Sequence, residues 1–268
     1  MDRSISSIQN PAVKQILTLK EKARERRKQG LFVIEGQREI ELAIKADYQL
    51  ETVYYSPEII AEEDLYSIKD QSDTNTAFVE ITYDIYEKIA YRATTEGVVA
   101  VAQTRDHSID RLKISSENPL ILVAEAPEKP GNIGALLRTA DAANVDAVLI
   151  ANPRTDIYNP NILRSSVGCI FTRSIALGST AEIIAFLKQN TIRIYCAALQ
   201  AAVPYHSCDF KPGSAIVVGT EADGLSKEWL KHSDQNIIIP MQGEIDSMNV
   251  SVAAGILIFE VKRQRDFN

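Results

Sequence analysis

The sequence has few of the residues that metal sites and disulfide frameworks require. Its 268 residues include only three histidines and three cysteines. The cysteines are odd in number and show no CxxC spacing, which is typical of reduced thiols in a cytoplasmic protein. The histidines are scattered and form no HExxH pair. We therefore expect a cytoplasmic location and no metal ion.

Long hydrophobic runs and familiar catalytic loops are also missing. No apolar run reaches the roughly 20 residues that span a bilayer, and residues 1–4 do not open an apolar signal segment. Residues 219–224 match neither a GxGxxG pattern nor a P-loop. No GxSxG nucleophile elbow occurs. The sequence thus gives no support for a membrane span, these nucleotide-binding loops or a serine-nucleophile triad.

The charge balance is acidic on average but basic in one segment. Lys and Arg number 29 against 36 Asp and Glu, so the formal net charge is −7. This balance argues against general nucleic-acid binding, because neutralising phosphates needs concentrated basic side chains. Residues 20–28, however, carry six basic and two acidic side chains. Such a segment is either a solvated helix face or a phosphate contact.

The first hundred residues predict a compact α/β domain. Apolar periodicity and turn residues predict helices at 10–29, 36–47, from 57 onward and at 83–90, with strands at 31–34, 51–55, 77–81 and 97–103. This part contains no nucleophile or metal-ligand spacing, so we interpret it as a recognition module. The polar stretch 106–117 lacks apolar periodicity and is expected to be a linker.

The remaining residues, 118–268, predict a second α/β domain. Its expected strands are continuously apolar and lie at 120–124, 147–150, 174–177, 192–198, 215–219 and 236–240. Continuous apolar strands are typical of a parallel sheet covered by helices on both faces. The helices are expected from 132, around 162–164, at 181–188, around Trp229 and at 250–261, with Ser247 as the last helix's N-cap.

Polar and glycine-rich residues gather at three expected strand ends, at 125–138, 219–225 and 243–251. Ligands of parallel sheets bind at the carboxyl ends of the strands. Asn, Arg, Glu and Ser side chains around glycine turns can orient a polar substrate and bind a ligand through backbone groups. We therefore expect a site at this edge of the sheet.

Three motifs occur in order within these clusters. They are Asn132-x-Gly134-Ala135-x-x-Arg138, then Gly219-x-Glu221-x-x-Gly224-Leu225, and then Ile239-Pro240-Met241 leading to Ser247-Met248-Asn249-Val250-Ser251. Together they closely resemble the motifs of the SpoU (TrmH-like) RNA 2′-O-methyltransferases of the SPOUT superfamily. Residues 10–14 and 32–36 are similar to the substrate-binding domain that precedes the catalytic domain in many members. The resemblance covers nearly the whole chain.

The resemblance implies a two-domain architecture. Residues 1–105 would form an L30e-like α/β domain that binds the RNA substrate, 106–117 a linker, and 118–268 a SPOUT catalytic domain with a parallel sheet and a C-terminal trefoil knot. It also implies S-adenosyl-L-methionine as the cofactor, with Ile239 and Met248 on either side of its adenine. The cofactor-binding residues would be Gly219, Thr220, Gly224, Ile239, Met241, Met248 and Ser251.

The resemblance also assigns catalytic and substrate-positioning roles to Asn132, Arg138, Glu221 and Asn249, with Ser247 nearby. The ribose 2′-hydroxyl attacks a sulfonium methyl that the cofactor has already activated. Because an arginine side chain stays protonated in proteins, we expect Arg138 to stabilise the developing alkoxide rather than act as the base. From the residues alone, Asn132, Glu221 and Asn249 could instead be helix caps or loop-to-helix hydrogen bonds. One departure is Glu128-Lys129-Pro130, where the family usually carries Asp-Pro.

Members of this family generally form homodimers through the catalytic domain, and the apolar helix at 250–261 is the candidate interface. The expected RNA contacts are Arg24, Arg26, Arg27, Lys28 and Arg164, with Arg154 and Arg173 as further candidates. The implied activity is methylation of a ribose 2′-hydroxyl, in ribosomal RNA because a separate N-terminal module is present. Transfer RNA as the substrate, and a catalytically inactive RNA-binding or ribosome-assembly protein of the same fold, are the alternatives.

Overall fold

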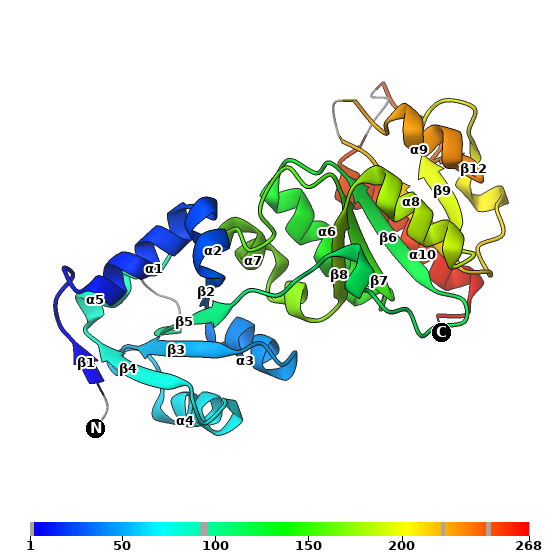
Figure 1. Cartoon of the computed structure of the whole chain (residues 1–268). Coiled ribbons are helices and arrows are strands. Elements are labelled where there is room, and N and C mark those ends of the chain that lie inside the picture. The colour runs from blue at the N-terminus through cyan, green and yellow to red at the C-terminus, as the bar shows by residue number, and fades with distance from the viewer. Residues whose placement is uncertain (1–2, 92–95, 221–222, 245–247, 268) are drawn as a thin grey trace. The chain divides into compact units, whose positions relative to one another are not determined.

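The computed structural model describes residues 3–91, 96–220, 223–244 and 248–267 (Figure 1). Contacts divide the chain into two compact units. The first consists of Met1–Arg105 and Asp156–Thr172, and the second of Asp106–Thr155 and Arg173–Asn268. Residues 106–117, expected to be a linker, thus group with the second unit, where Ile109 belongs to the core and Leu112 and Ile114 pack against it.

The first unit is built on a mixed sheet. Its strands are β1 (Arg3–Ile5), β2 (Leu31–Glu35), β3 (Leu50–Tyr55), β4 (Ala77–Ile81) and β5 (Val98–Gln103), in the order β1-β4-β3-β5-β2. β5 runs antiparallel to both of its neighbours. The helices are α1 (Pro11–Glu21), α2 (Ala23–Gln29), α3 (Gln37–Lys45), α4 (Glu62–Gln71) and α5 (Tyr83–Ile89). The predicted strands are confirmed; the short β1 was missed.

Two helix predictions in this unit need correction. The helix expected over 10–29 is interrupted at Lys22, which is extended at φ −115° and ψ 104°. The carbonyls of Leu19 and Lys20 at the end of α1 accept hydrogen bonds from Arg26 of α2, so the second helix folds back onto the first. The helix expected from Pro57 begins at Glu62, because Ser56 closes a turn through its carbonyl with the backbone of Ile59 and Ile60.

Residues 156–172 pack onto the first unit through aromatic rings. They contain α7 (Pro160–Ser166) and the 3-10 helix η2 (Cys169–Phe171). The Tyr158 ring lies 4.2 Å from that of Phe32 between centroids, and the Phe171 ring lies 5.0 Å from that of Tyr48. The Tyr158 hydroxyl also accepts a hydrogen bond from the backbone N–H of Arg105 at 2.9 Å. This segment is therefore part of the first unit's core.

The second unit contains the predicted parallel sheet. Its strands are β6 (Leu120–Glu125), β7 (Ala147–Ala151), β8 (Ser174–Gly178), β9 (Arg193–Ala197), β10 (Val203–Pro204), β11 (Ser214–Val218) and β12 (Gln235–Ile238), in the order β10-β12-β9-β11-β6-β7-β8. All of these pairings are parallel, which confirms the prediction.

Helices cover this sheet. α8 (Thr180–Gln189) and α9 (Lys227–His232) pack into a core cluster with Val123 and Val217, which includes Trp229. Ala124 alternates with Val123 along β6 and lines a pocket together with Leu136 of α6 (Pro130–Ala142) and Val250 of α10 (Val250–Gln264). Because successive side chains of a strand point to opposite faces of the sheet, α8 and α9 cover one face, and α6 and α10 cover the other. In the part of the chain that the structure describes, no helix is long and apolar enough to cross a membrane.

Candidate active site

Two of the three motif clusters meet through the side chains of Asn132 and Asn249. Asn132 lies in the first turn of α6. Asn249 caps α10, because its Oδ1 accepts hydrogen bonds from the backbone N–H of Ser251 at 3.0 Å and from the Ser251 hydroxyl at 2.6 Å. Its Nδ2 donates to Asn132 Oδ1 at 3.1 Å. The N-cap expected at Ser247 is therefore Asn249, and Ser247 itself lies outside the described residues.

This hydrogen bond brings the starts of two helices together. α6 and α10 pack against each other, and an added Cβ at Gly255 would be in ordinary van der Waals contact with Thr139 Cγ2, at 3.9 Å. A helix N-terminus carries unpaired backbone N–H groups and a partial positive charge. Two helix N-termini side by side can stabilise negative charge that develops on a bound oxygen.

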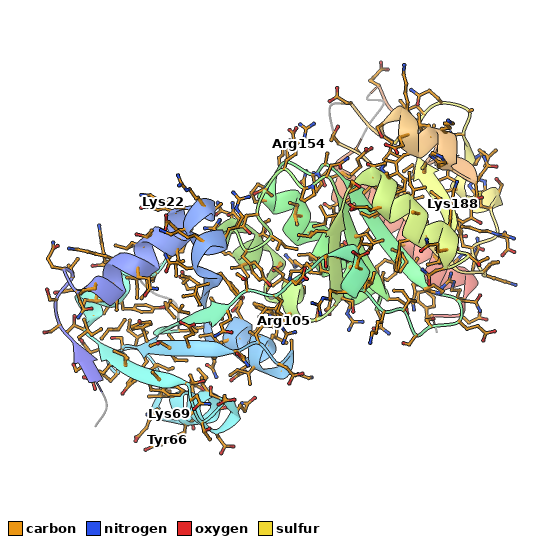
Figure 2. The ribbon with its side chains drawn as sticks, in the orientation of Figure 1. Lys22, Tyr66, Lys69, Arg105, Arg154 and Lys188 are labelled. Atoms are coloured by element: carbon orange, nitrogen blue, oxygen red, sulfur yellow. The ribbon has the colours of Figure 1, made fainter. Side chains whose placement is uncertain are left out.

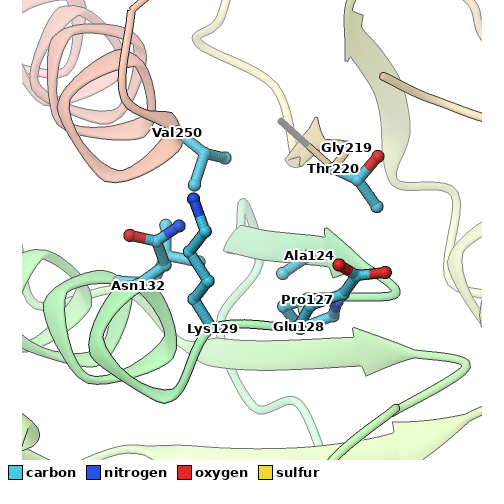
Figure 3. Close-up of a pocket in the computed structure, with 9 residues that line it drawn as sticks. Ala124, Pro127, Glu128, Lys129, Asn132, Gly219, Thr220 and Val250 are labelled. Atoms are coloured by element: carbon cyan, nitrogen blue, oxygen red, sulfur yellow. The ribbon is translucent and has the colours of Figure 1, made fainter. Parts of the chain in front are cut away.

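A pocket of about 110 Å³ lies beside the paired helix starts (Figure 3). It is at the carboxyl ends of β6 and β11, where the sequence predicted a site. Its walls are mostly apolar, and Figure 3 shows Lys129 extending between Asn132 and Val250. The lining residues are Ala124, Pro127, Glu128, Lys129, Asn132, Leu136, Gly219, Thr220 and Val250.

The loop after β11 closes tightly on itself. The backbone N–H of Thr220 donates to the Gly224 carbonyl at 3.0 Å, and that of Gly224 donates to the Thr220 carbonyl at 3.1 Å. An added Cβ at Gly219 would lie 2.2 Å from the carbonyl carbon and oxygen of Gly224, so only glycine fits there. Gly224 has φ +67°, in the left-handed region. The close approach therefore requires glycine at 219, and the left-handed backbone favours glycine at 224. Glu221 lies outside the described residues.

Glu125 holds the end of this loop and was missed by the sequence analysis. Its side chain is buried at the end of β6. One carboxylate oxygen accepts the backbone N–H of Ser226 at 2.7 Å, and the other accepts the Thr180 hydroxyl at 3.2 Å. Glu125 thus ties the residue after the loop to β6 and to the start of α8. The available signal was a carboxylate at the end of an otherwise apolar strand.

Arg138 does not share the face of α6 that carries Asn132. It follows Asn132 by six positions, which is about 240° around a helix, and it is exposed. Among the described residues, none forms a hydrogen bond or an ion pair with its guanidinium. Within one copy of the chain, the structure brings Asn132 and Asn249 together but not Arg138.

The remaining predicted cofactor residues lie around the third motif. Ile239 and Met241 follow β12, and Met248 precedes Asn249. Ile239 and Met248 are half-buried, whereas the side chain of Met241 is exposed. As far as the described residues define the pocket, these three side chains are not part of its lining.

The predicted RNA contacts divide into exposed and buried side chains. Arg24, Arg27 and Lys28 are exposed and share one face of α2, at positions i, i+3 and i+4. Arg26 is only 3% exposed, and its Nε donates to Asp156 Oδ2 at 2.5 Å while Nη1 donates to the Leu19 carbonyl at 2.6 Å. Because its guanidinium is occupied inside the unit, Arg26 is a structural residue and is not available to RNA.

The other arginine candidates also have protein partners. Arg154 is paired with Glu128, and Arg173 with Asn144 and with Asp141. Arg164 is exposed and lies over the ring of Tyr91.

Cys196 does not supply a nucleophile near the site. Burial, with a smaller contribution from the charges of Glu125 and Asp234, raises the pKa of its thiol to about 11. The thiol donates to the Trp229 carbonyl at 3.7 Å. It is therefore neutral at physiological pH and belongs to the core.

Comparisons with known proteins agree with this arrangement. Residues 119–259 match the model of the SpoU rRNA Methylase family, and residues 10–100 match an MRM3-like substrate binding domain. The 23S rRNA (guanosine(2553)-2'-O)-methyltransferase RlmP of Bacillus subtilis (strain 168) is 29% identical over 263 residues, which cover 97% of this chain and 99% of that protein. A 23S rRNA (guanosine-2'-O-)-methyltransferase RlmB of Vibrio parahaemolyticus is 30% identical over 203 residues, which cover 74% of this chain and 82% of that protein.

Solved structures show the same fold over almost the whole chain. A crystal structure of an RNA 2'-O ribose methyltransferase superposes with a TM-score of 0.83 at 35% identity, covering 98% of this chain and 99% of the other. The SpoU methyltransferase AviRb from Streptomyces viridochromogenes, in complex with the cofactor AdoMet, superposes with a TM-score of 0.85 at 25% identity, covering 97% and 100%.

Proposed function

This chain belongs to the SpoU rRNA methylase family, and we propose that it transfers a methyl group from S-adenosylmethionine to a ribose 2′-hydroxyl of ribosomal RNA. The observation that carries the proposal is the hydrogen bond between Asn249 and Asn132 beside the pocket at the strand ends. The full-length similarity to RlmP, including the N-terminal domain, supports ribosomal RNA as the substrate. A cytoplasmic location is part of the proposal.

The residues around the pocket fit the cofactor. Apolar side chains of Ala124, Leu136 and Val250 offer a surface for a flat ring, and the absence of a side chain at Gly219 lets a ligand approach the backbone there. When bound, S-adenosylmethionine supplies a methyl group already activated by its sulfonium. We assign its binding to Gly219, Thr220, Gly224, Ile239, Met241, Met248 and Ser251, from the third and second motifs. The trefoil knot belongs to the same proposal.

The chain's own contribution is orientation and charge stabilisation. A 2′-hydroxyl bound beside the hydrogen-bonded pair of Asn132 and Asn249 would be held in line with the methyl group, which makes the reaction effectively unimolecular. As its proton passes to solvent water, the paired helix starts would stabilise the negative charge on the oxygen. We propose that Arg138, which is exposed on α6, contacts the alkoxide or an adjacent phosphate. Glu221 and Ser247 are assigned to the site by their motif positions.

The experiment for this function is transfer of labelled methyl from S-adenosylmethionine to ribosomal and transfer RNA from a strain that lacks the gene. Mass spectrometry of nuclease-resistant dinucleotides would locate the label. A 2′-O-methyl nucleotide in ribosomal RNA is the expected result. Label found only in transfer RNA would mean that transfer RNA, and not ribosomal RNA, is the substrate. Cofactor binding without methyl transfer to either RNA or to ribosomal particles would favour an inactive RNA-binding protein.

We propose that the chain forms a homodimer through an apolar face of α10. Val252 is 54% exposed and Phe259 is 42% exposed, and helical spacing puts both on one side of the helix with Ile256. Such a face on both copies can form a self-complementary interface. Val252→Glu plus Phe259→Glu is expected to lower the mass in light scattering from twice 29.7 kDa to the monomer value. Tyr66→Glu, on an exposed tyrosine of α4 (Figure 2), should leave the dimer intact. A double variant that remains dimeric would exclude this interface.

We propose that Arg24, Arg27 and Lys28 contact RNA phosphates. Arg27→Glu plus Lys28→Glu is expected to weaken RNA binding about tenfold or more and to flatten its salt dependence, because fewer counterions are released. Cofactor binding, measured by calorimetry, should not change. Lys188→Glu plus Lys231→Glu makes the same charge change on the second unit and serves as the control (Figure 2 labels Lys188). Equal losses in both double variants would mean that net charge, and not this face, governs binding.

A further inference from the structure

Tyr91 and Arg164 form an exposed pair on the first unit. The Arg164 guanidinium carbon lies 3.9 Å from the centroid of the Tyr91 ring. Tyr91 is 54% exposed, and Arg164 is exposed as well. Tyr91 follows α5, whereas Arg164 lies in α7, so the pair joins the two segments that make up this unit.

Both members of the pair are held by well-anchored backbone. The backbone N–H of Tyr91 donates to both carboxylate oxygens of Glu35, each at 2.8 Å, and Glu35 ends β2. Lys20 forms an ion pair with the same carboxylate at 3.3 Å, so its charge is balanced. On the other side, α7 is fixed by the buried side chains of Ile162 and Leu163. The backbone at both positions is thus held by contacts within the first unit.

The pair adjoins the basic face of α2. Arg26 of α2 bonds to Asp156, which lies four residues before α7 begins at Pro160. Figure 1 shows α2 and α7 next to each other, as this bond requires. Arg24, Arg27 and Lys28 on the outer face of α2 therefore belong to the same part of the unit as Arg164. The first unit thus carries an exposed aromatic ring, a guanidinium over it and, on neighbouring α2, a row of exposed cations.

We propose that Tyr91 and Arg164 form a stacking platform for an unpaired base of the RNA substrate. This inference rests on the proposed RNA substrate and adds the way in which the first unit binds it. Proteins recognise single-stranded RNA by stacking its bases on aromatic rings or arginine planes, next to cations that contact the backbone. The pair provides both surfaces, and the exposed cations of α2 lie on the same unit. A fully paired helix offers no such base, so the platform would select a loop, a bulge or a strand end.

The test is binding of the full-length protein to a fluorescein-labelled single-stranded adenine decamer, with an abasic decamer as the second probe. Tyr91→Ala is expected to weaken binding of the adenine decamer about tenfold, since each stacked base contributes strongly. Tyr91→Phe, which keeps the ring, should bind within about twofold of the unchanged protein. Arg164→Ala should also weaken binding. For the abasic decamer, Tyr91→Ala and the unchanged protein should have equal affinity.

Tyr66→Ala is the matched control, because Tyr66 is exposed to a similar degree on α4 of the same unit. The platform is overturned if Tyr91→Ala binds the adenine decamer as well as the unchanged protein, if it loses equally on the abasic decamer, or if the unchanged protein binds neither. Methyl transfer to ribosomal RNA is measured separately. If the protein methylates ribosomal RNA but Tyr91→Ala binds the adenine decamer normally, only the platform is wrong. If Tyr91→Ala weakens binding of the adenine decamer but not of the abasic one, and no methyl transfer occurs, only the methylation proposal is wrong.

Discussion

Asn249→Ala is expected to lower methyl transfer to RNA about a hundredfold or more, the usual effect of removing one positioned polar group from an active site. The same change removes the N-cap of α10 and is expected to lower the free energy of unfolding by about 1 kcal/mol. The two effects have separate origins, because Oδ1 accepts from Ser251 while Nδ2 donates to Asn132. Single-turnover transfer of labelled methyl and urea unfolding measure them independently.

Asn249→Ser separates the cap from the site. Serine is as good an N-cap as asparagine, but its side chain is too short to reach Asn132. We expect this variant to unfold like the unchanged protein and to lose transfer nearly as much as Asn249→Ala. Asn132→Ala combined with Asn249→Ala should cost less than the sum of the single changes, because the two residues share one hydrogen bond. Full activity of Asn249→Ser would mean that Asn249 is only a helix cap.

The sheet of the second unit could be predicted because its signal is local. Each strand is a short apolar run between turn residues, and burial on both faces leaves no polar alternation. β6 was expected over 120–124 and extends to Glu125. The sequence did not place that last residue in the strand. Its buried carboxylate accepts hydrogen bonds from Thr180 and Ser226, and both partners are distant in sequence. Local patterns identify apolar strands well and buried carboxylates poorly.

The active-site geometry was partly accessible from the motifs. Their positions at strand ends indicated one common edge, and Asn132 and Asn249 do meet there. The spacing of six places Asn132 and Arg138 on different faces of α6, a separation that the motif match alone does not show. The close approach of Gly219 to Gly224 is a backbone contact, which side-chain patterns do not report.

The basic segment shows what sequence reasoning could not reach. A run of cations on a helix is normally solvated, so Arg26 was grouped with its neighbours. Its partner Asp156 is 130 positions away in the chain, and the segment that carries it had been expected in the other domain. Only the fold reveals that one arginine of the run faces inward. There it donates to carbonyls at the end of α1 and holds residues 156–172 through Asp156.

Arg26→Met is expected to lower the free energy of unfolding by about 3–5 kcal/mol, because it leaves the carboxylate of Asp156 buried without its cation. The Arg26 side chain is 3% exposed and that of Asp156 is 12% exposed, so water can replace little of the lost interaction. Two carbonyls at the end of α1 lose their donor as well. Urea unfolding followed by circular dichroism measures the loss, and limited proteolysis should show earlier cleavage within 156–172.

Arg27→Met is the matched control, since the neighbouring arginine is exposed and its removal should change stability by no more than about 0.5 kcal/mol. Adding Asp156→Asn to Arg26→Met should recover part of the loss, because it removes the unpaired charge. These three variants separate the two roles of the basic run. If Arg26→Met were as stable as Arg27→Met and lost RNA affinity instead, Arg26 would belong to the RNA-binding face and the ion pair with Asp156 would contribute nothing to the fold.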